Sequence, residues 1–575
     1  MGHVALLWAV LMSWAVIPLF AVAQQPGDSV PTIRSRTELI LVPVKVTRSG
    51  QHARGLDQSV FHVFDNGQQR PITGFEEVAR KQGSQPLEKT SEKIPAQWRT
   101  NQPQWVGESS LTVVVFDAVN TSLRYPGSLF QRAYLINARQ EFVRFIDDNP
   151  SFTGKMMVAV LGAGGLRIVH HYSGDPQSLK HDLEKLPFPP SLRDQDEPPQ
   201  FSARIPPNIE KAELFAAIAG FRSYSLGTTA AATSRDATAA AFQQLANSLA
   251  AIPGRKTMIW ITSGLPIVNP NSYHPMWVDE RLEKARQALA AANVVVYPIS
   301  INPGVDNPVW TSPAEATSSV PEHPSLKQPL GPLGSAMDLL AFAEKTGGQV
   351  CSYDTHMDRC FKKALNDSAE YYLLSYYVAA PRKPGWHKIR VKVDVPGVRV
   401  RARQGYMQPE PTQDLPLDQI NLALASPLDF TSIPFSLRWS TATTGSGEPV
   451  NAAIKGVDSP NAAAGATSAS GTSRTATCEI LLDPRSLTMV ASEFNHMKFD
   501  VILLVLGNDN GERAAKVVQT IDLHPRPGSL AKMLENGILY RKQLNLPPGR
   551  YVARAAVRDW FDGRIGTLTV PLSIE

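Results

Sequence analysis

The stretch that decides the fold reads LTVVVFD and spans residues 111–117. Apolar side chains fill it almost without interruption until Asp117 ends it. A strand that is covered on both faces has this composition, because neither face of the strand meets water. The stretch therefore predicts a central strand of a parallel sheet, with Asp117 at the carboxyl end of that strand.

Short apolar runs and helical patterns alternate on the C-terminal side of this stretch. Further buried strands are predicted at residues 156–161, 257–262 and 294–299. Helices with apolar residues at helical spacing are predicted between them, at residues 128–147, 236–250 and 279–292. This alternation predicts an α/β fold with a doubly wound, mainly parallel sheet, which we place at residues 109–408.

Residues 36–78, on the N-terminal side, are predicted to form a small β module. Apolar residues at strand spacing predict strands at 39–46 and 61–64. Between strands, Asp65-Asn66-Gly67 predicts a tight hairpin turn, because Asn and Gly tolerate the positive φ angles of such turns. Residues 79–108 are polar and rich in Pro and Gln, so we interpret them as a linker.

Residues 409–575 carry strand signals and are predicted to form a C-terminal β-sandwich. Two hairpins are predicted around Asp509-Asn510-Gly511 and Asp562-Gly563, each flanked by apolar strands. Within this domain, residues 441–476 are rich in Ala, Ser, Thr and Gly. Such a composition cannot bury a core, so we predict a flexible low-complexity insert there.

The N-terminus indicates export. Residues 4–22 are apolar, and Ala21-Val22-Ala23 forms a small-x-small cleavage pattern, so residues 1–23 are predicted to be a secretory signal peptide. The alternative is an uncleaved N-terminal anchor. No later stretch reaches about 18 apolar residues, so no transmembrane segment is predicted in the mature chain. We expect the protein in the periplasm, on the outer surface or in the medium.

The charge pattern does not indicate a nucleic-acid partner. The chain has 57 lysines and arginines against 52 acidic residues, and no run of basic residues that would form a nucleic-acid footprint. Arg399, Arg401 and Arg403 alternate with apolar residues, which predicts that they share one face of a strand. That face either binds an anionic partner or is a solvated sheet face.

The three cysteines leave one structural question open. Cys351 and Cys360 are close enough in sequence to close a small disulfide loop in an oxidising compartment. The alternative is two unpaired small apolar residues. Cys478 is left over in either case, and the absence of a C-x-x-C pair argues against a zinc ribbon or thioredoxin-like chemistry.

Polar residues follow the central strand at the edge where open α/β sheets bind ligands. A hard divalent cation prefers oxygen ligands of the kind that this edge offers. The candidate ligand-binding residues are Asp117, Asn120, Thr121, Ser122, Thr228, Thr229 and Ser263. The alternative is that Asp117 and Asn120 satisfy backbone groups of the turn and cap the next helix.

No pattern in the sequence supports catalysis. A P-loop, an H-E-x-x-H helix and a G-x-S-x-G elbow are all absent. Ser263 follows a strand in Thr262-Ser263-Gly264, but no sequence pattern supplies a base for it. We therefore predict that the chain is not an enzyme and that it needs no cofactor, unless Mg²⁺ binds at the sheet edge.

Several segments together resemble the acidobacterial von Willebrand factor A-related family. The resemblance covers most of residues 36–575, and it is specific as a set rather than in any one piece. Its segments are FHVFDNG at 61–67, VVVFDAVNT at 113–121, GRKTMIWITSG at 254–264, AEKTGG at 343–348, RARQGY at 401–406 and PGRYVARAAVRD at 548–559. The resemblance implies a type A α/β domain.

The family also implies a Mg²⁺ site of the adhesion type, and this sequence departs from its pattern. Asp117 matches the first aspartate of Asp-x-Ser-x-Ser, whereas Val119 and Thr121 stand at the two serine positions. Thr228 or Thr229 matches the threonine of the second loop, and Ser263 replaces the aspartate of the third. The resemblance therefore implies a degenerate metal site with Asp117, Thr121 and Thr228 as its ligands.

Three functions are open at this stage. The first is an exported binding or adhesion-type protein that recognises a protein or cell-surface ligand through the type A domain. The second is a structural scaffold of an envelope complex, with the C-terminal sandwich as the contact surface. The third is an extracytoplasmic hydrolase that uses Asp117 and Ser263. The sequence does not indicate the oligomeric state.

Overall fold

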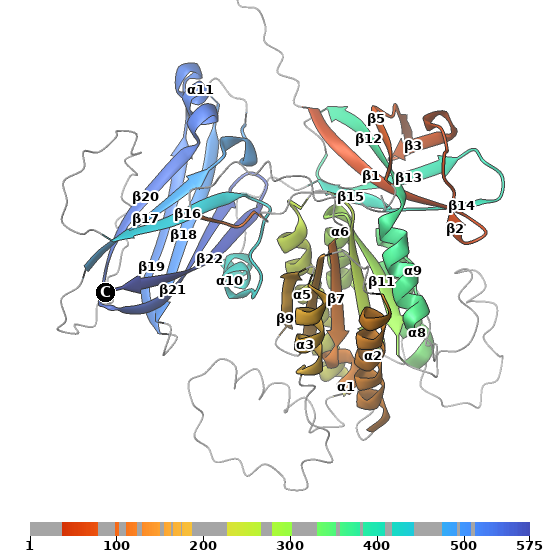
Figure 1. Cartoon of the computed structure of the whole chain (residues 1–575). Helices are drawn as coiled ribbons and strands as arrows, with labels where there is room; N and C mark the ends of the chain where they lie inside the picture. Colours follow the sequence, from red (N-terminus) through yellow and green to blue (C-terminus); the bar gives the residue numbers. More distant parts are fainter. Residues whose placement is uncertain are drawn as a thin grey trace, which may run out of the picture.

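The computed structural model contains three folded units, arranged as Figure 1 shows. The predicted signal peptide at 1–23 lies outside the described residues. No helix among the described residues is both long and apolar enough to span a membrane. The structure describes residues 37–78, 98–102, 111–123, 129–149, 155–162, 165–173, 175–186, 227–252, 254–265, 279–301, 331–351, 357–379, 383–408, 417–441, 474–490, 495–507 and 512–575.

The N-terminal β module is built from two separate parts of the chain. One sheet has the order β14-β1-β12-β5, with β2 pairing to β1, and the other has the order β15-β13-β3-β4. Their apolar residues form one common core. The strands are β1 (Thr37–Arg48), β2 (Gln51–His52), β3 (Phe61–Asp65), β4 (Gln68–Arg70), β5 (Gly74–Val78), β12 (Tyr371–Ala379), β13 (Gly385–Val393), β14 (Val398–Ala402) and β15 (Gly405–Gln408).

This arrangement corrects the predicted domain boundary at residue 408. Strands β12 to β15 were assigned to the α/β domain, but β12 pairs with β1 and β5, and β13 pairs with β3. The α/β domain is thus an insertion into the β module. The alternation of apolar residues identifies a strand but not its partner, so the pairing of segments that lie about three hundred residues apart in sequence was not readable.

The α/β domain holds a five-stranded sheet of order β11-β10-β7-β8-β9. Neighbouring strands are parallel except that β9 runs antiparallel to β8. Its strands are β7 (Leu111–Asp117), β8 (Lys155–Gly162), β9 (Gly165–Ser173), β10 (Lys256–Thr262) and β11 (Val294–Ser300). Its helices are α1 (Ala118–Leu123), α2 (Leu129–Asp148), α3 (Pro176–Glu184), α5 (Gly227–Leu249), α6 (Glu280–Ala291), α8 (Gly331–Thr346) and α9 (Met357–Ala369).

Helices cover both faces of this sheet, which explains the apolar run of β7. Val113 and Val115 pack into a core that contains residues of α5, α6 and α8. Val114 and Phe116 point the other way, into a core that contains residues of α2, α3 and α9. All residues of β7 are buried. A strand between two helical layers must be apolar at successive positions, because its side chains alternate between two dry cores.

The C-terminal domain contains two four-stranded antiparallel sheets that share one core. The sheet orders are β20-β17-β16-β6 and β19-β18-β21-β22. The strands not yet given are β6 (Arg99–Thr100), β16 (Phe435–Thr441), β17 (Arg474–Leu482), β18 (Met497–Gly507), β19 (Arg513–Leu523), β20 (Ile538–Leu546), β21 (Gly549–Asp559) and β22 (Ile565–Ile574). Both predicted hairpins are present, as β18–β19 and β21–β22.

Three details of this domain differ from the sequence prediction. Strand β6 comes from the segment 79–108, and the buried side chain of Asn101 beside it donates to the carbonyls of Phe430 and Ile433. That part of the predicted linker is therefore structural. Helices α10 (Leu417–Ala425) and α11 (Pro527–Asn536) also occur in the domain predicted to be all β. The predicted insert at 441–476 is shorter than expected, since β16 reaches Thr441 and β17 begins at Arg474; residues 442–473 lie outside the described part.

Arg403 joins the β module to the α/β domain. Its guanidinium donates to the carbonyls of Ala290 and Ala291 at the carboxyl end of α6, and to the carbonyl of Leu41 on β1. Only 7% of Arg403 is exposed. Burial lowers its pKa to about 10, so it remains charged at neutral pH and compensates the partial negative charge of the helix end.

Arg401 forms a second connection between these two units. It pairs with Asp367 of α9, whose carboxylate also lies 3.7 Å from the ammonium of Lys45 on β1. Lys45 is itself buried and donates to the carbonyl of Glu370. Of the three alternating arginines, only Arg399 is exposed. Arg401 and Arg403 therefore form neither a solvated sheet face nor a free surface for an anionic partner. Both sequence interpretations are wrong for these two arginines, because their guanidinium groups are bound within the protein.

We expect Arg403→Met to lower the free energy of unfolding of the module and α/β domain by about 2–4 kcal/mol, because three carbonyls lose a charged donor. Denaturant unfolding followed by circular dichroism measures this change. Arg399→Met is the matched control, since it removes an exposed arginine from the same segment and should change the free energy by less than about 0.5 kcal/mol. Equal effects of the two substitutions would contradict the role assigned to Arg403.

Candidate functional site

Asp117 lies at the carboxyl end of β7, where the sequence predicted a ligand site. It is completely buried, with 0% exposure. Its Oδ1 atom accepts a hydrogen bond of 2.9 Å from the backbone amide of Asn120. Asn120 is the third residue of α1, so this contact caps the amino end of the helix in the usual way for an aspartate. The capping alternative raised from the sequence therefore matches the observed hydrogen bond.

The second oxygen of Asp117 accepts three further hydrogen bonds from side chains. The donors are Nδ2 of Asn120 at 2.7 Å, Oγ1 of Thr262 at 2.7 Å and Nε1 of Trp260 at 3.0 Å. Trp260 and Thr262 belong to β10, the neighbouring parallel strand. The carboxylate thus joins the ends of two strands to the first turn of a helix, entirely through protein donors.

Two opposing effects act on the charge of Asp117. Burial raises the pKa of Asp117 above its usual value, and the hydrogen bonds from Asn120, Thr262 and Trp260 offset only part of that rise. The four contacts described above all donate to the carboxylate, so they stabilise its ionised form. A buried charge of this kind is tolerated only when donors replace its lost hydration.

Asn120 extends the same network to α5. Its Nδ2 atom also lies 2.9 Å from Oγ1 of Thr238, which in turn donates to the carbonyl of Ser234 at 2.8 Å. The amide of Asn120 therefore presents its nitrogen to Asp117 and its oxygen away from the carboxylate. That oxygen is buried and has no hydrogen-bond partner among the described residues.

The donor set around Asp117 does not fit a Mg²⁺ ion. Magnesium requires near-octahedral oxygen ligands, but Oδ2 of Asp117 is surrounded by two N–H groups and one hydroxyl. Val119, at a serine position of the family pattern, is an apolar residue of the core. Ser263, at the position of the third-loop aspartate, is only 2% exposed. We therefore assign Asp117 a structural role and derive no metal chemistry from it.

Other predicted site residues are placed only through their backbone. Thr121 and Ser122 lie in α1, and Thr228 and Thr229 lie in the first turn of α5. The side chains of these four residues are outside the described part of the chain, so their convergence on Asp117 stays a prediction. Thr238 and Trp260 were not predicted. No local pattern marks them, because they reach Asp117 from a different helix and a different strand.

Two of the three cysteines form a disulfide in the α/β domain, and the third lies in the C-terminal domain. Cys351 and Cys360 are joined in a disulfide, with their Cα atoms 5.9 Å apart. Cys351 also forms a parallel bridge with Ile299 at the end of β11, so the bond ties α9 to the edge of the sheet. Cys478 is buried in the C-terminal core, where burial and the nearby Glu479 raise its pKa to about 12. A thiol with so high a pKa is unreactive at neutral pH.

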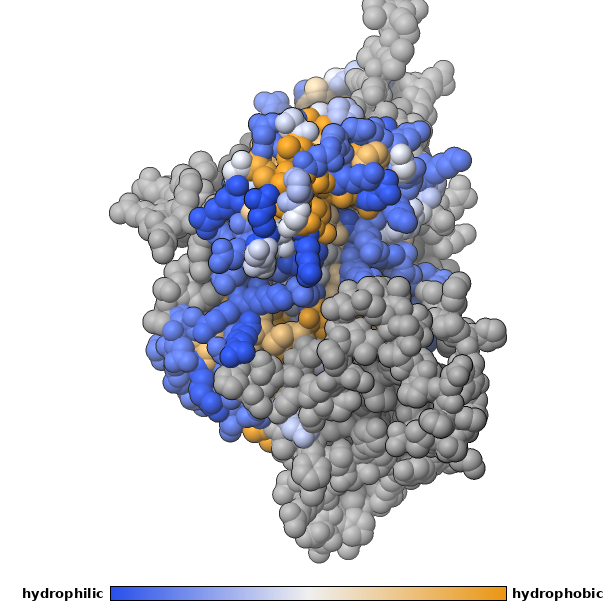
Figure 2. Space-filling view, turned by 90° about the vertical axis from the view of Figure 1, so that its right-hand side faces the viewer, coloured by the Kyte–Doolittle hydropathy of each residue, from blue (hydrophilic) through white to orange (hydrophobic). Residues whose placement is uncertain are grey.

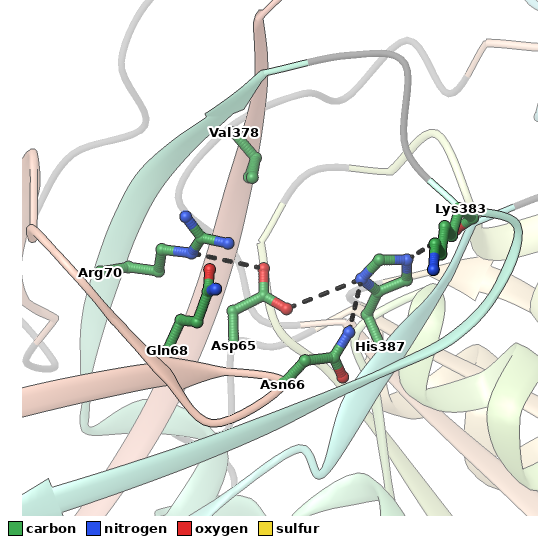
Figure 3. Close-up of a pocket in the computed structure, with 7 residues that line it drawn as sticks. All are labelled: Asp65, Asn66, Gln68, Arg70, Val378, Lys383 and His387. Atoms are coloured by element: carbon green, nitrogen blue, oxygen red, sulfur yellow. Dashed lines mark hydrogen bonds and ion pairs between the residues drawn. The ribbon is translucent and has the colours of Figure 1, made fainter.

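A polar pocket of about 470 Å³ lies on the β module, next to the β3–β4 turn (Figure 3). Its buried carboxylate, Asp65, accepts hydrogen bonds from the hydroxyls of Tyr376 and Tyr406 at 3.3 and 3.0 Å. The Nε atom of Arg70 lies 4.0 Å from the same carboxylate. The residues that line the pocket are Asp65, Asn66, Gln68, Arg70, Val378, Lys383 and His387.

His387 is held in this pocket by both of its ring nitrogens. Nε2 contacts the carbonyl of Lys383 at 2.8 Å, and Nδ1 contacts Nδ2 of Asn66 at 3.1 Å. Nδ1 also lies 3.7 Å from Oδ1 of Asp65. These contacts give His387 a structural role at the turn, and they do not form a nucleophile–base pair.

Similarity to known proteins is found among solved structures. No protein-family model matches the chain. No curated protein matches it either.

Similar solved structures include three that differ in kind. An aerotolerance-related membrane protein from Bacteroides fragilis is 13% identical, with coverage of 45% of this chain and 98% of that one and a TM-score of 0.24. A von Willebrand factor type A protein from Catenulispora acidiphila is 11% identical, with coverages of 52% and 66% and a TM-score of 0.22. The pilus adhesin SpaC from Lactobacillus rhamnosus GG is 7% identical, with coverages of 80% and 53% and a TM-score of 0.24. At these values the similarities say nothing about ligand or activity.

We expect Asp117→Asn to destabilise the α/β domain by about 2–4 kcal/mol, because an amide nitrogen would face donors that now share a buried carboxylate. Thermal or denaturant unfolding measures the loss. Asp147→Asn is the matched control, since Asp147 is a half-exposed carboxylate paired with Lys180 and such surface pairs contribute little. An unchanged stability in Asp117→Asn would show that the network does not support the fold.

Proposed function

We propose that the chain is an exported, non-enzymatic binding protein with a von Willebrand factor A-type α/β domain, and that it contacts a protein or cell-surface partner. The type A assignment rests on the resemblance of the sequence segments and is consistent with the strand order around β7. The observation that carries the binding proposal is an exposed apolar face on the β module.

That face lies on the side of β1 and β12 that is turned away from the core of the module, next to the part of this side where Lys45 meets Asp367 of α9. Leu39 and Tyr377 are directly opposite each other across the two strands, and they are 46% and 55% exposed. Leu41 and Leu373 lie on the same side at strand spacing and are half-buried. We call these four residues the outer apolar face. The residues between them, such as Ile40 and Leu374, point into the core of the module.

The composition of this face suits a protein partner. Single exposed apolar residues are ordinary, but adjacent ones on a flat sheet mark contact surfaces more often. Tyrosine is enriched at such surfaces because its ring adds contact area and its hydroxyl stays solvated. Figure 2 shows a separate group of hydrophobic residues with hydrophilic residues around them, on the side of the molecule that faces right in Figure 1.

This proposal moves recognition away from the sheet edge at Asp117. The carboxylate there is committed to protein donors, and Asn120 is committed to the same network. A hydrolase mechanism receives no support from Ser263 either, because a nucleophile must be reached by its substrate and Ser263 is 2% exposed. The scaffold alternative keeps its own contact surface, the C-terminal sandwich, on which Val518 is 60% exposed.

We expect calorimetric titration with Mg²⁺ to show no saturable binding that depends on Asp117, because its oxygens already accept hydrogen bonds from the protein. The comparison uses the chain from residue 24 onward, with Asp117→Asn and the control Asp147→Asn. Saturable binding in the unsubstituted chain and in Asp147→Asn, but not in Asp117→Asn, would restore metal-dependent recognition at the sheet edge.

We expect Leu39→Ser/Tyr377→Ser to reduce capture of envelope or surface proteins at least about tenfold, because a contact surface loses its apolar centre. The measurement is affinity capture from envelope extract, quantified by mass spectrometry. Both substitutions are at exposed positions, so the fold should be retained. Val518→Ser on the C-terminal domain is the control. Loss of capture in Val518→Ser alone would favour the scaffold alternative instead.

A further inference from the structure

The C-terminal sandwich brings two histidines and an aspartate together on its outer surface. Strand β18 begins at Met497 and β19 ends at Leu523, and these two residues are paired. The next residues beyond this pair, His496 and His524, therefore face each other at the ends of the two strands. Asp522 lies two residues before His524, so its side chain is on the same side of the sheet as both histidines.

The exposed fractions of the side chains show that this side of the sheet faces solvent and not the core. Met497 and Leu523 between the polar residues are 0% and 9% exposed and belong to the core. The side chains of His496, Asp522 and His524 are 26%, 44% and 54% exposed. The three polar groups thus project from the sheet toward solvent, where an ion can reach them.

The distances among the three groups are those of potential ligands to one ion. Nε2 of His496 is 2.7 Å from Oδ1 of Asp522, and Nδ1 of His524 is 3.6 Å from the same oxygen. Each residue offers one ligand atom, and all three atoms lie within 4.8 Å of one another. Ligands about 2.0–2.1 Å from a tetrahedral zinc ion are about 3.3–3.4 Å apart. The observed distances of 2.7 and 3.6 Å lie on either side of that value.

We propose that His496, Asp522 and His524 bind a divalent transition-metal ion of the Zn²⁺ class. Imidazole nitrogens select Zn²⁺, Ni²⁺ or Cu²⁺ over Mg²⁺ and Ca²⁺, which require oxygen ligands. Two histidines and a carboxylate supply three ligands and leave the fourth position of a tetrahedral site open. A water molecule or a side chain of a partner takes that position. This site is independent of the proposed apolar contact face.

Surrounding groups already hold the first histidine in place. The backbone of His496 is bonded in both directions to Val490, at 2.9 and 3.0 Å, and its ring packs edge-on against Phe561 at 5.0 Å. The rings of His496 and His524 are stacked, with centroids 4.1 Å apart. A ligand whose position is fixed before binding loses less conformational freedom when the ion arrives.

Lys498 opposes the binding of a cation at this site. Its ammonium lies 3.9 Å from Oδ2 of Asp522 and 4.1 Å from the centroid of the Trp560 ring. The ammonium competes with the ion for the carboxylate. Replacing Lys498 with a neutral residue should therefore tighten the binding of the metal ion. If Asp522 and the histidines had only a structural role, this substitution would not increase metal affinity.

The test is calorimetric titration of the full chain, purified without a histidine tag, with ZnCl₂. We expect one equivalent of Zn²⁺ to bind, and we expect His524→Ala and Asp522→Asn each to weaken binding at least about tenfold. His524 is exposed, so its removal leaves the fold intact. Lys498→Gln should bind more tightly than the unsubstituted chain. His171→Ala, which removes an exposed histidine of β9, is the matched control and should bind normally.

Two results would overturn the proposal. One is the absence of saturable binding at millimolar Zn²⁺ in the unsubstituted chain and in Lys498→Gln. The other is binding that His496→Ala/His524→Ala leaves unchanged, because the ion would then be held elsewhere. Unfolding curves of the same variants check that each is folded, and Zn²⁺ should raise the melting temperature only where it binds.

Discussion

Strand β1 pairs with β12, and the arrangement of the first two domains depends on that pairing. The two strands are separated by the whole α/β domain, so pairing them brings residues 371–408 back to residues 37–78 across that domain. Closing so long a loop costs conformational entropy, which the common core of the module must offset. Arg403 and the Lys45–Asp367–Arg401 group then fix the module against the inserted domain.

The buried carboxylate of Asp117 has a comparable role inside the α/β domain. The carboxyl edge of an open α/β sheet, where Asp117 lies, is a common place for ligands. In this chain the carboxylate is oriented by Trp260, Thr262 and Asn120 toward its own fold. The same position in the sheet can therefore serve ligand binding or stability, depending on whether neighbouring residues supply oxygens or N–H donors.

The surfaces proposed for binding lie on the two β domains and not at the carboxyl edge of the parallel sheet. The outer apolar face belongs to the β module, and the histidine pair belongs to the C-terminal sandwich. Both arise from cross-strand pairs, in which residues from two strands meet on one side of a sheet. The α/β domain then holds the β module on one side and, through the contact of Thr431 with α5, the sandwich on the other.

The sequence by itself determined the mixed α/β class, the strands 111–117 and 257–262, the helices near 128–147 and 279–292, and the two C-terminal hairpins. These features depend on local periodicity and turn chemistry, which are written in consecutive residues. Tertiary structure alone decided that residues 371–408 complete the first module, that Arg99–Thr100 joins the last one, and that Trp260 binds Asp117. It also placed His496 opposite His524. Each of these contacts joins segments far apart in the chain, and a local pattern shows which residues face inward or outward but not which distant residue they meet.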